Sequence, residues 1–343
     1  MNKTKNILLT GASGAVGYEV LKLLSSSQDN FKVTLFDIKS NNSKHKFNKL
    51  PNNFEVVYGD ISNNKDVEKI SKNKDIVIHL AAIIPPLADE KPELSYKVNT
   101  LGTRNLIENL EKNSPACFFL YSSSISVYGD RLNNPLINVG DPLTPSAKDE
   151  YAITKIEAEK IIQKSKLDWS IFRLCAIMGN HKISKLMFHQ PLNTSLEIAT
   201  PIDTARAFVN AIEKQPQLSK IIFNLGGGRE CRSTYNEFLS KSFKIYGLGK
   251  LNFLPNTFAE RNFHCGFYED GDDLNNILNF RKDTFESYYL KEAQKLTSIK
   301  KWFISILRNP IKKYLQNRSE PYNAVKNNDL KLILHFFNKG FAH

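Results

Sequence analysis

The sequence lacks the features that mark membrane-spanning, disulfide-rich and zinc-binding proteins. Among its 343 residues no apolar run approaches the ~18 residues that a transmembrane helix requires. The run before Gly11 is too short for a signal peptide, so we expect none. The four cysteines lie far apart without a Cys-x-x-Cys pair, and the seven histidines are scattered. We therefore expect no metal and predict a cytoplasmic protein.

Acidic residues are scarce only at the C-terminal end. The chain has 47 Lys and Arg against 35 Asp and Glu, a formal charge of +12. Ten of the basic and two of the acidic residues lie in 295–343, which leaves 37 and 33 for residues 1–294, a net charge of +4. Because the body is nearly balanced, we predict no nucleic-acid partner.

Short apolar segments alternate with amphipathic ones as far as residue 227. Runs rich in Val, Ile, Leu and Phe predict buried strands, and the segments between them predict helices. We expect strands at 6–10, 32–37, 54–60, 75–82, 116–124, 168–174 and 220–227, and helices at 14–26, 64–72, 92–112, 150–166 and 203–214. This alternation predicts an α/β fold, a Rossmann-like, doubly wound parallel sheet with helices on both faces.

A glycine triplet follows the first expected strand. Gly11, Gly14 and Gly17 lie in "LLTGASGAVGYEV", between that strand and a helix. Such a turn lets a pyrophosphate approach the backbone and presents free N–H groups at a helix N-terminus. Asp37 closes the second strand, where a carboxylate accepts hydrogen bonds from the ribose hydroxyls of NAD and repels the extra phosphate of NADP. We predict NAD as the cofactor, with NADP less favoured; Lys39 lies close by and would soften this preference.

Tyr151 and Lys155 share one face of the helix expected at 150–166. A free tyrosine is a poor base at neutral pH, and a nearby lysine cation or an oxidised nicotinamide would favour the phenolate by lowering its pKa. Ser124 ends a preceding strand, and strand ends in such a sheet face the ligand crevice. These three side chains predict hydride transfer at a secondary alcohol, with Tyr151 removing the proton. Ser122 and Ser123 are alternatives to Ser124.

Taken in order, these motifs resemble those of the extended short-chain dehydrogenases/reductases, also called the NAD-dependent epimerase/dehydratase family. The resemblance extends from residue 6 to about residue 230 and includes "TGASGAVG", "GDI", "HLAA", "VNTLGTRNLIE", "YSSSISVYG", "YAITK" and "IATPIDTARAFVNAI". It implies Ser124, Tyr151 and Lys155 as catalytic residues. It also implies a homodimer through the helices at 92–112 and 150–166. The cofactor-binding residues that it implies are Gly11, Ser13, Gly14, Ala15, Val16, Gly17, Asp37, Asp60, Ile61, Leu80, Ala81, Ala82, Asn99, Tyr151 and Lys155.

The chain departs from the nucleotide-sugar enzymes of this family. Ala176 stands where they have an Asn that reaches the nucleotide diphosphate, and the stretch between Gly179 and Ala199 is short. Ile125 and Ser126 replace the acidic pair of the dehydratases, so dehydration is not expected. The substrate stays open: a sugar, a sugar acid or another polyol-like alcohol, with or without a nucleotide. Candidate contacts are Ile83–Leu87, Met178, His189, Arg229, Arg232 and His264.

The sequence therefore predicts an NAD-dependent oxidoreductase or epimerase that acts on a secondary hydroxyl of a sugar or sugar derivative. The alternative is a catalytically silent NAD(P)-binding sensor or scaffold. We predict an NAD-binding Rossmann domain at 1–180 and 201–228, a substrate lobe at 181–200 and 229–294, and a basic helical tail at 295–343, in which Pro310 interrupts the helix. Two interpretations of the tail stay open, docking on its own domain or peripheral contact with an anionic membrane.

Overall fold

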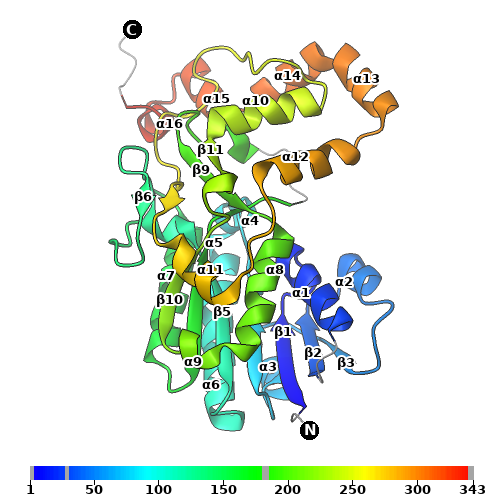
Figure 1. Cartoon of the computed structure of the whole chain (residues 1–343). Coiled ribbons are helices and arrows are strands. Elements are labelled where there is room, and N and C mark those ends of the chain that lie inside the picture. Colours follow the sequence, from blue (N-terminus) through cyan, green and yellow to red (C-terminus); the bar gives the residue numbers. More distant parts are fainter. Residues whose placement is uncertain (1–3, 28–30, 180–184, 339–343) are drawn as a thin grey trace.

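A parallel sheet of seven strands forms the centre of the computed structural model, which describes residues 4–27, 31–179 and 185–338 (Figure 1). The strand order is β10-β7-β5-β4-β1-β2-β3. The predicted Rossmann-like sheet is therefore confirmed. Its strands are β1 (Lys5–Thr10), β2 (Phe31–Asp37), β3 (Phe54–Tyr58), β4 (Ile76–His79), β5 (Phe118–Ser124), β7 (Asp168–Leu174) and β10 (Ile221–Leu225).

Helices cover both faces of this sheet. Within β1, Ile7 and Leu9 join the core on one face and Leu8 joins the core on the other, because successive side chains of a strand point to opposite faces. The first face is covered by α1 (Ala15–Ser26), α8 (Pro201–Asn210) and α11 (Gly271–Leu278), and the second by α3 (Asn64–Ile70), α6 (Gly102–Asn113) and α7 (Glu150–Lys164). The central strands are thus buried between two helical layers, whereas β3 at the edge of the sheet is only partly buried.

The helix expected over 92–112 is present but is not α-helical throughout. It consists of α5 (Pro92–Ser95), a π-helical turn η1 (Tyr96–Leu101) and α6. The turn places the buried Asn99 side chain against the loop that follows β4, where it makes hydrogen bonds described below. Such π-helical turns are frequent at functional sites.

A smaller lobe stands on the carboxyl edge of the sheet. Its three-stranded sheet consists of β8 (Ala176–Ile177), β9 (Ser195–Ala199) and β11 (Arg232–Thr234), and α10 (Tyr235–Ile245) and α12 (Phe285–Gln294) pack on it. The buried carboxylate of Glu197 accepts hydrogen bonds from the backbone N–H groups of Gly228 and Tyr268 at 2.9 and 3.0 Å, and pairs with Arg232 Nε at 2.9 Å. Arg232 is thus part of the lobe's interior.

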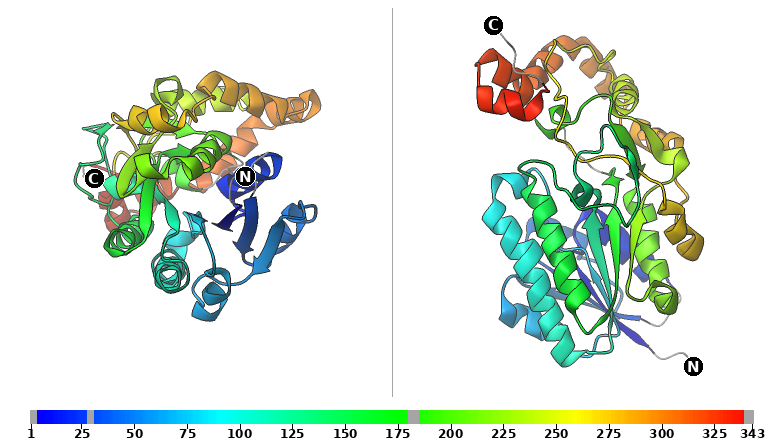
Figure 2. Two further views of the ribbon diagram at one scale, coloured as in Figure 1. Left: turned by 60° about the horizontal axis from the view of Figure 1, so that its bottom comes forward. Right: turned by 90° about the vertical axis from the view of Figure 1, so that its left-hand side faces the viewer.

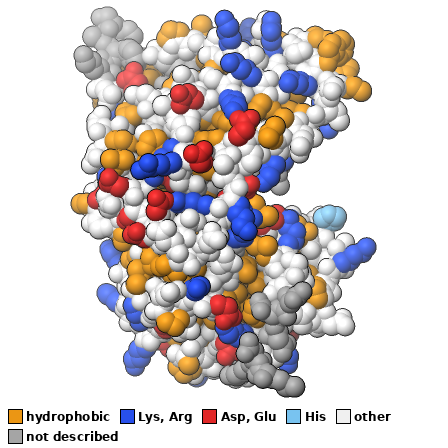
Figure 3. Space-filling model, in the orientation of Figure 1, with side chains coloured by type: hydrophobic (Ala, Val, Ile, Leu, Met, Phe, Trp, Pro, Cys, Tyr) orange, Lys and Arg blue, Asp and Glu red, His pale blue; other side chains and the backbone are white. Residues whose placement is uncertain are grey.

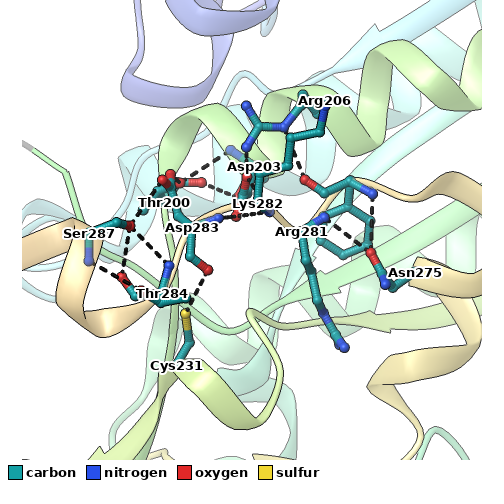
Figure 4. A network of polar contacts seen from close by, with 12 residues as sticks. Thr200, Asp203, Arg206, Cys231, Asn275, Arg281, Lys282, Asp283, Thr284 and Ser287 are labelled. Atoms are coloured by element: carbon teal, nitrogen blue, oxygen red, sulfur yellow. Dashed lines mark hydrogen bonds and ion pairs between the residues drawn. The ribbon is translucent and has the colours of Figure 1, made fainter.

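A polar network joins α8 to the segment that leads into α12 (Figure 4). Thr200 caps α8 by accepting from the N–H of Asp203 at 3.2 Å, and donates to the carboxylate of Asp283 at 2.6 Å. The Asp203 carboxylate, which also pairs with Arg206, accepts the N–H groups of Lys282 and Asp283 at 3.1 and 2.9 Å. Residues far apart in the sequence are thereby held at one point of the fold.

The tail forms four helices rather than one interrupted helix. They are α13 (Ser298–Ile306), α14 (Arg308–Asn317), α15 (Glu320–Lys326) and α16 (Leu330–Phe336). The break falls at Leu307, so that Pro310 lies in the first turn of α14, where its missing N–H is tolerated. The last two helices dock on the lobe: Ser319 donates to Thr257 O at 2.6 Å, and Phe336 O accepts from Glu260 N at 2.7 Å. Residues 339–343 of the predicted tail, and 181–184 of the predicted lobe, lie outside the described residues.

The remaining elements are short. They are α2 (Asn41–Lys46), α4 (Leu87–Glu90), η2 (Ile125–Tyr128), β6 (Leu136–Ile137), η3 (Lys185–Phe188), η4 (Ala211–Glu213), α9 (Gln215–Leu218), η5 (Arg229–Cys231) and β12 (Phe267–Tyr268). No helix within the described ranges is long and apolar enough to cross a membrane.

Candidate active site

The glycine loop joins β1 to α1 at the carboxyl edge of the sheet. Gly11 has a φ of 70°, and a Cβ atom there would lie 2.7 Å from the backbone nitrogen of Ala81. A Cβ atom at Gly17 would overlap the carbonyl oxygen of Gly11. Both positions therefore require glycine so that the backbone can pack this closely.

The N-terminus of α1 is suited to an anion. Gly14 is its N-cap and has no side chain to bond the first N–H groups, and the first turn, which begins with Ala15 and Val16, has no acidic residue. Free N–H groups and the positive end of the helix dipole favour a phosphate at such a position. The loop therefore fits the pyrophosphate of a dinucleotide.

Asp37 ends β2 beside the glycine loop. Its carboxylate accepts the N–H of Ser13 at 2.7 Å and the N–H of Ile38 at 2.8 Å, and each oxygen keeps a further lone pair. Lys46 of α2 donates to the carbonyl oxygen of Ser13 at 2.8 Å. Desolvation lowers the pKa of Lys46, and the negative charge of Asp37 opposes this effect. Sequence reasoning missed Lys46 because α2 was not expected, and singled out Lys39, which is exposed.

The loops after β3 and β4 lie next to this turn. The carboxylate of Asp60 accepts the N–H and the hydroxyl of Ser62, both at 2.8 Å, and Ile61 is buried against Gly102. After β4, Leu80 N donates to Thr10 O at 3.2 Å and Ala81 N to Thr10 Oγ1 at 3.3 Å. Ala82 follows and is partly buried. These predicted contacts are thus gathered along one edge of the sheet.

Asn99 holds the loop after β4 in place. Its amide oxygen accepts from Ile83 N at 2.8 Å, and its amide nitrogen lies 2.9 Å from Ile83 O, 3.1 Å from Ser95 Oγ and 3.0 Å from Thr154 Oγ1. These partners occupy both ends of the amide. Asn99 therefore positions the loop, and its role in cofactor binding stays a prediction.

The three predicted catalytic side chains come together at the ends of β5 and α7. Tyr151 lies in the first turn of α7, close to Ser124. Lys155 is almost fully buried one turn later, with Nζ 5.7 Å from the centroid of the Tyr151 ring. It donates to Ser122 O at 2.8 Å and to the hydroxyl of Tyr121 at 3.3 Å. Sequence reasoning missed Tyr121, whose role depends on the packing of β5 against α7.

The other two serines of β5 are engaged elsewhere. Ser123 donates to the buried carboxylate of Glu159 at 2.5 Å, and Ser122 donates to His79 O at 3.3 Å. Ser124 is the serine of this strand that meets Tyr151. Alternation along the strand separates Ser123 from the other two serines, and the hydrogen bond to His79 O distinguishes Ser122, so Ser124 stays the predicted catalytic serine.

Burial controls the ionisation of this site. Desolvation raises the pKa of Tyr151 well above its usual value, and the hydrogen bond with Ser124 offsets part of the rise. Desolvation also lowers the pKa of Lys155 to about 7, against the attraction of Glu159. From the sequence we predict the opposite, a lowered pKa for Tyr151. That prediction takes into account the favourable charge of Lys155 and not the loss of water around the phenol.

A buried ion pair supports the site from below. Glu159 and Arg173 form a two-point contact, with Nε to Oε1 at 3.0 Å and Nη2 to Oε2 at 2.7 Å. Arg173 also donates to the hydroxyl of Tyr128 at 2.7 Å. Bidentate arginine–carboxylate pairs fix geometry as well as charge. This pair therefore anchors β7 to α7, the helix that carries Tyr151 and Lys155.

Charged groups of several elements gather near the start of α7. Asp149, the N-cap of α7, contacts His264 at 2.9 Å, and Glu320 of α15 contacts Lys185 at 2.8 Å and His189 at 2.9 Å. Desolvation, together with the charge of Asp149, raises the pKa of Asp89 to about 6, although its side chain reaches solvent. Sequence reasoning named the two histidines but missed Asp89, Lys185 and Glu320, which have no motif.

The other candidate substrate contacts are dispersed. Within Ile83–Leu87, Ile84 and Leu87 are exposed. Met178 packs against the core of the smaller lobe, and Arg232 is held by Glu197, whereas Arg229 is exposed on η5. In the described part of the chain, no three His, Cys, Asp or Glu side chains gather as metal ligands would.

Comparison with known proteins identifies the family. Residues 7–195 match the model of the NAD dependent epimerase/dehydratase family. The chain belongs to this family. The predicted family is thereby confirmed, and NAD dependence is part of its description.

Curated members of this family match part of the chain. It is 29% identical over 153 residues to D-erythronate dehydrogenase of Haemophilus influenzae, covering 43% of this chain and 42% of the relative. It is 34% identical over 184 residues to UDP-glucose 4-epimerase of Vibrio cholerae, covering 51% and 52%. The chain thus spans about half the length of the curated relatives it matches.

Solved structures of family members share the fold over most of the chain. A short-chain dehydrogenase/reductase superfamily protein from Agrobacterium tumefaciens with bound NAD has a TM-score of 0.66 at 18% identity, covering 84% of this chain and 96% of that one. UDP-glucose 4-epimerase of Thermotoga maritima with UDP-glucose has a TM-score of 0.67 at 19% identity, covering 84% and 99%. At these identities the likeness is one of fold.

Proposed function

We propose that this protein is an NAD-dependent oxidoreductase or epimerase that acts on a secondary hydroxyl of a sugar or sugar derivative. The observation that carries the proposal is the contact of Tyr151 with Ser124 above the buried Lys155, at the edge of the sheet that holds the glycine loop. A sensor or scaffold would not require an amine buried beside a phenol, since burying an ammonium is unfavourable.

The roles of the site residues follow from their contacts. Ser124 would hold the substrate oxygen, and Tyr151 would exchange a proton with it. The neighbouring groups alone keep the phenol protonated, because burial raises its pKa. Tyr151 is therefore poised to donate a proton to a substrate carbonyl, and it would act as a base only with additional positive charge nearby. Bound NAD would supply the hydride chemistry.

The test of this proposal is Tyr151→Phe, which removes the hydroxyl and keeps the ring. We expect turnover to fall by about 100-fold or more, with little change in NAD binding, because a positioned acid or base contributes about that much. Tyr96→Phe, at an exposed tyrosine, is the matched control. Turnover would be measured with sugars, sugar acids and nucleotide sugars, following NADH absorbance and product. Undiminished activity in Tyr151→Phe would show that Tyr151 is not the proton donor.

The preference for NAD is proposed from Asp37. Lys46 lies close to its carboxylate and to Ser13. If the carboxylate is removed in Asp37→Ala, Lys46 and the Ser13 N–H are released to meet a ribose 2′-phosphate. We expect NAD to bind about tenfold more weakly, since charge-assisted hydrogen bonds are lost, and NADP to bind more tightly. Titration of both cofactors, with Asp273→Ala at an exposed aspartate of α11 as a control, would measure this; an unchanged preference would contradict the role of Asp37.

The substrate class is also a proposal. The relatives include an enzyme named for a sugar acid and one named for a nucleotide sugar. The charged groups near the start of α7 favour a polar, hydroxyl-rich molecule. Accumulation of NADH in the activity assay would indicate a dehydrogenase, and product without net NADH an epimerase.

We also propose a homodimer in the cytoplasm. Helices α6 and α7 lie side by side on one side of the molecule (Figure 2), and Ile153 of α7 is exposed there. Light scattering on the purified protein in solution would measure its molar mass and therefore its oligomeric state.

A further inference from the structure

Helix α13 presents apolar side chains to solvent. Ile299, Trp302, Phe303, Ile306 and Leu307 are between 49% and 69% exposed. At the helical period of 3.6 residues these five positions lie within one continuous arc of the surface. In Figure 3 the same region forms an apolar patch at the upper right, beside lysine and arginine side chains. The arc is wide enough to be the contact face of an amphipathic helix.

The opposite side of α13 makes the contact with the body of the protein. Ile304 packs against the apolar cluster of Phe243, Leu248 and Leu315. None of the described residues of α13 is fully buried. The helix therefore contacts the body of the protein through Ile304 and, beside Gly247, through Lys301, while its broader apolar face is exposed. An ordinary surface helix has the reverse arrangement.

Basic residues border the apolar arc. Between Lys295 and Arg318 the sequence contains seven lysines and arginines and no aspartate or glutamate. Lys300, Lys301, Arg308 and Lys313 are exposed. A protein partner would need an acidic surface to match them, and a second copy of this chain would bring the same positive charges together. An anionic lipid surface satisfies both the apolar and the basic parts at once.

We propose that α13 and the basic residues around it bind the surface of an anionic membrane, with the apolar arc at the level of the lipid headgroups. Tryptophan and phenylalanine favour this interface, and basic side chains there contact the lipid phosphates. In Figure 1 α13 projects at the upper right, away from α6 and α7 at the lower left, so membrane contact and the proposed dimer are compatible.

The proposed contact lies next to the cleft between the two lobes, which is visible as the indentation in Figure 3. Helix α12 leads directly into α13, and its residues Tyr288 and Lys291 line the cleft opposite Ala15 and Tyr18 of α1. Binding through α13 would therefore place the edge of this cleft close to the membrane. The proposal does not depend on the catalytic activity, since lipid binding is measured without substrate.

The experiment uses the full chain and vesicles of phosphatidylcholine with or without phosphatidylglycerol. We expect the protein to sediment with the anionic vesicles and to be released by salt, because salt screens the charges. The double variant Trp302→Ser, Phe303→Ser should bind about tenfold more weakly. Leu330→Ser, Leu334→Ser is the matched control, because both leucines are about as exposed, on α16.

Intrinsic fluorescence gives a second readout. The chain has two tryptophans; Trp169 is buried and Trp302 is exposed. Insertion of α13 predicts a blue shift on adding anionic vesicles, which the double variant at 302 and 303 should lack. The proposal is overturned if the wild type stays in the supernatant or if this variant binds as tightly as the wild type. It is also overturned if this variant changes the oligomeric state in light scattering and leaves vesicle binding unchanged, because the apolar arc would then be a contact between two copies of the chain.

Discussion

At the scale of single residues, the position of Lys155 decides much of the site's character. Removing an ammonium group from water is unfavourable. Lys155 is nevertheless almost fully buried, and it donates to Ser122 O and to the hydroxyl of Tyr121. Its lowered pKa, about 7, means that a small change in pH alters its charge. Its Nζ lies 5.7 Å from the centroid of the Tyr151 ring, within the proposed catalytic group. Stability and chemistry are therefore opposed at this residue.

Replacing Lys155 by Met should reveal this opposition. Because the folded pKa is lowered, the folded wild type binds fewer protons than the unfolded chain between about pH 7 and the ordinary lysine pKa of ~10.4. Its stability therefore rises with pH across that window, by on the order of 2 kcal/mol between about pH 7 and 9. Lys155→Met should lack this rise and lose turnover.

Lys160→Met is the control, since Lys160 is exposed on the same helix. Urea unfolding at several pH values would measure the effect. Equal pH dependence in wild type and Lys155→Met would contradict the burial of the ammonium.

Residues that belong to a motif were predicted, and their supporting partners were not. The glycines, Asp37, Ser124, Tyr151 and Lys155 follow from local spacing, because a turn, a strand end or one helical face brings each to its place. Lys46, Glu159 and Asp89 reach the site through tertiary packing that has no local signal. Their roles required the structure.

At the scale of elements, the sequence predicted the strands of the sheet and a helical tail, but not where the helices change or end. Each strand is a short apolar run, and such runs are distinctive in a buried parallel sheet. The breaks at η1 and at Leu307 depend on side-chain packing and on where Pro310 is tolerated. Helical periodicity continues through both breaks, so it could not locate them.

Helix α15 provides a test at this scale. Glu320 at its start pairs with Lys185 and His189, and the hydrogen bond from His189, followed by that from Lys185, lowers the pKa of Glu320 to about 2. Because the folded pKa is lowered, this contribution is present above the ordinary glutamate pKa of ~4.3 and is lost as pH falls towards 2.

Glu320→Gln should lower the free energy of unfolding at neutral pH by up to about 1 kcal/mol, since the groups are partly exposed. Glu286→Gln, at an exposed pair with Lys241, is the control and should change little. Denaturant unfolding at neutral and acidic pH measures both. A loss that persists unchanged in acid would contradict the ion-pair explanation.

At the scale of the whole molecule, docking on the body of the protein accounts for only part of the tail, and membrane contact stays a proposal for α13. Ala324, Ile333 and Phe336 are buried in one cluster with Ala259 of the smaller lobe, so α15 and α16 belong to the fold. The broader apolar face of helix α13 is exposed to solvent. The basic composition of the tail is shared by both parts, which is why the sequence alone left the choice open.

This division predicts different results for two changes in the tail. A chain that ends at Arg318 loses α15, α16 and the contact of Glu320 with Lys185. Removing a buried isoleucine or phenylalanine side chain costs about 2–5 kcal/mol, so this chain should be insoluble or melt at a much lower temperature than the wild type. The double variant at Trp302 and Phe303 should have the same melting temperature as the wild type, because both side chains are exposed. Thermal melts of the three proteins decide the matter: if the shortened chain melts like the wild type, its last two helices are not part of the fold.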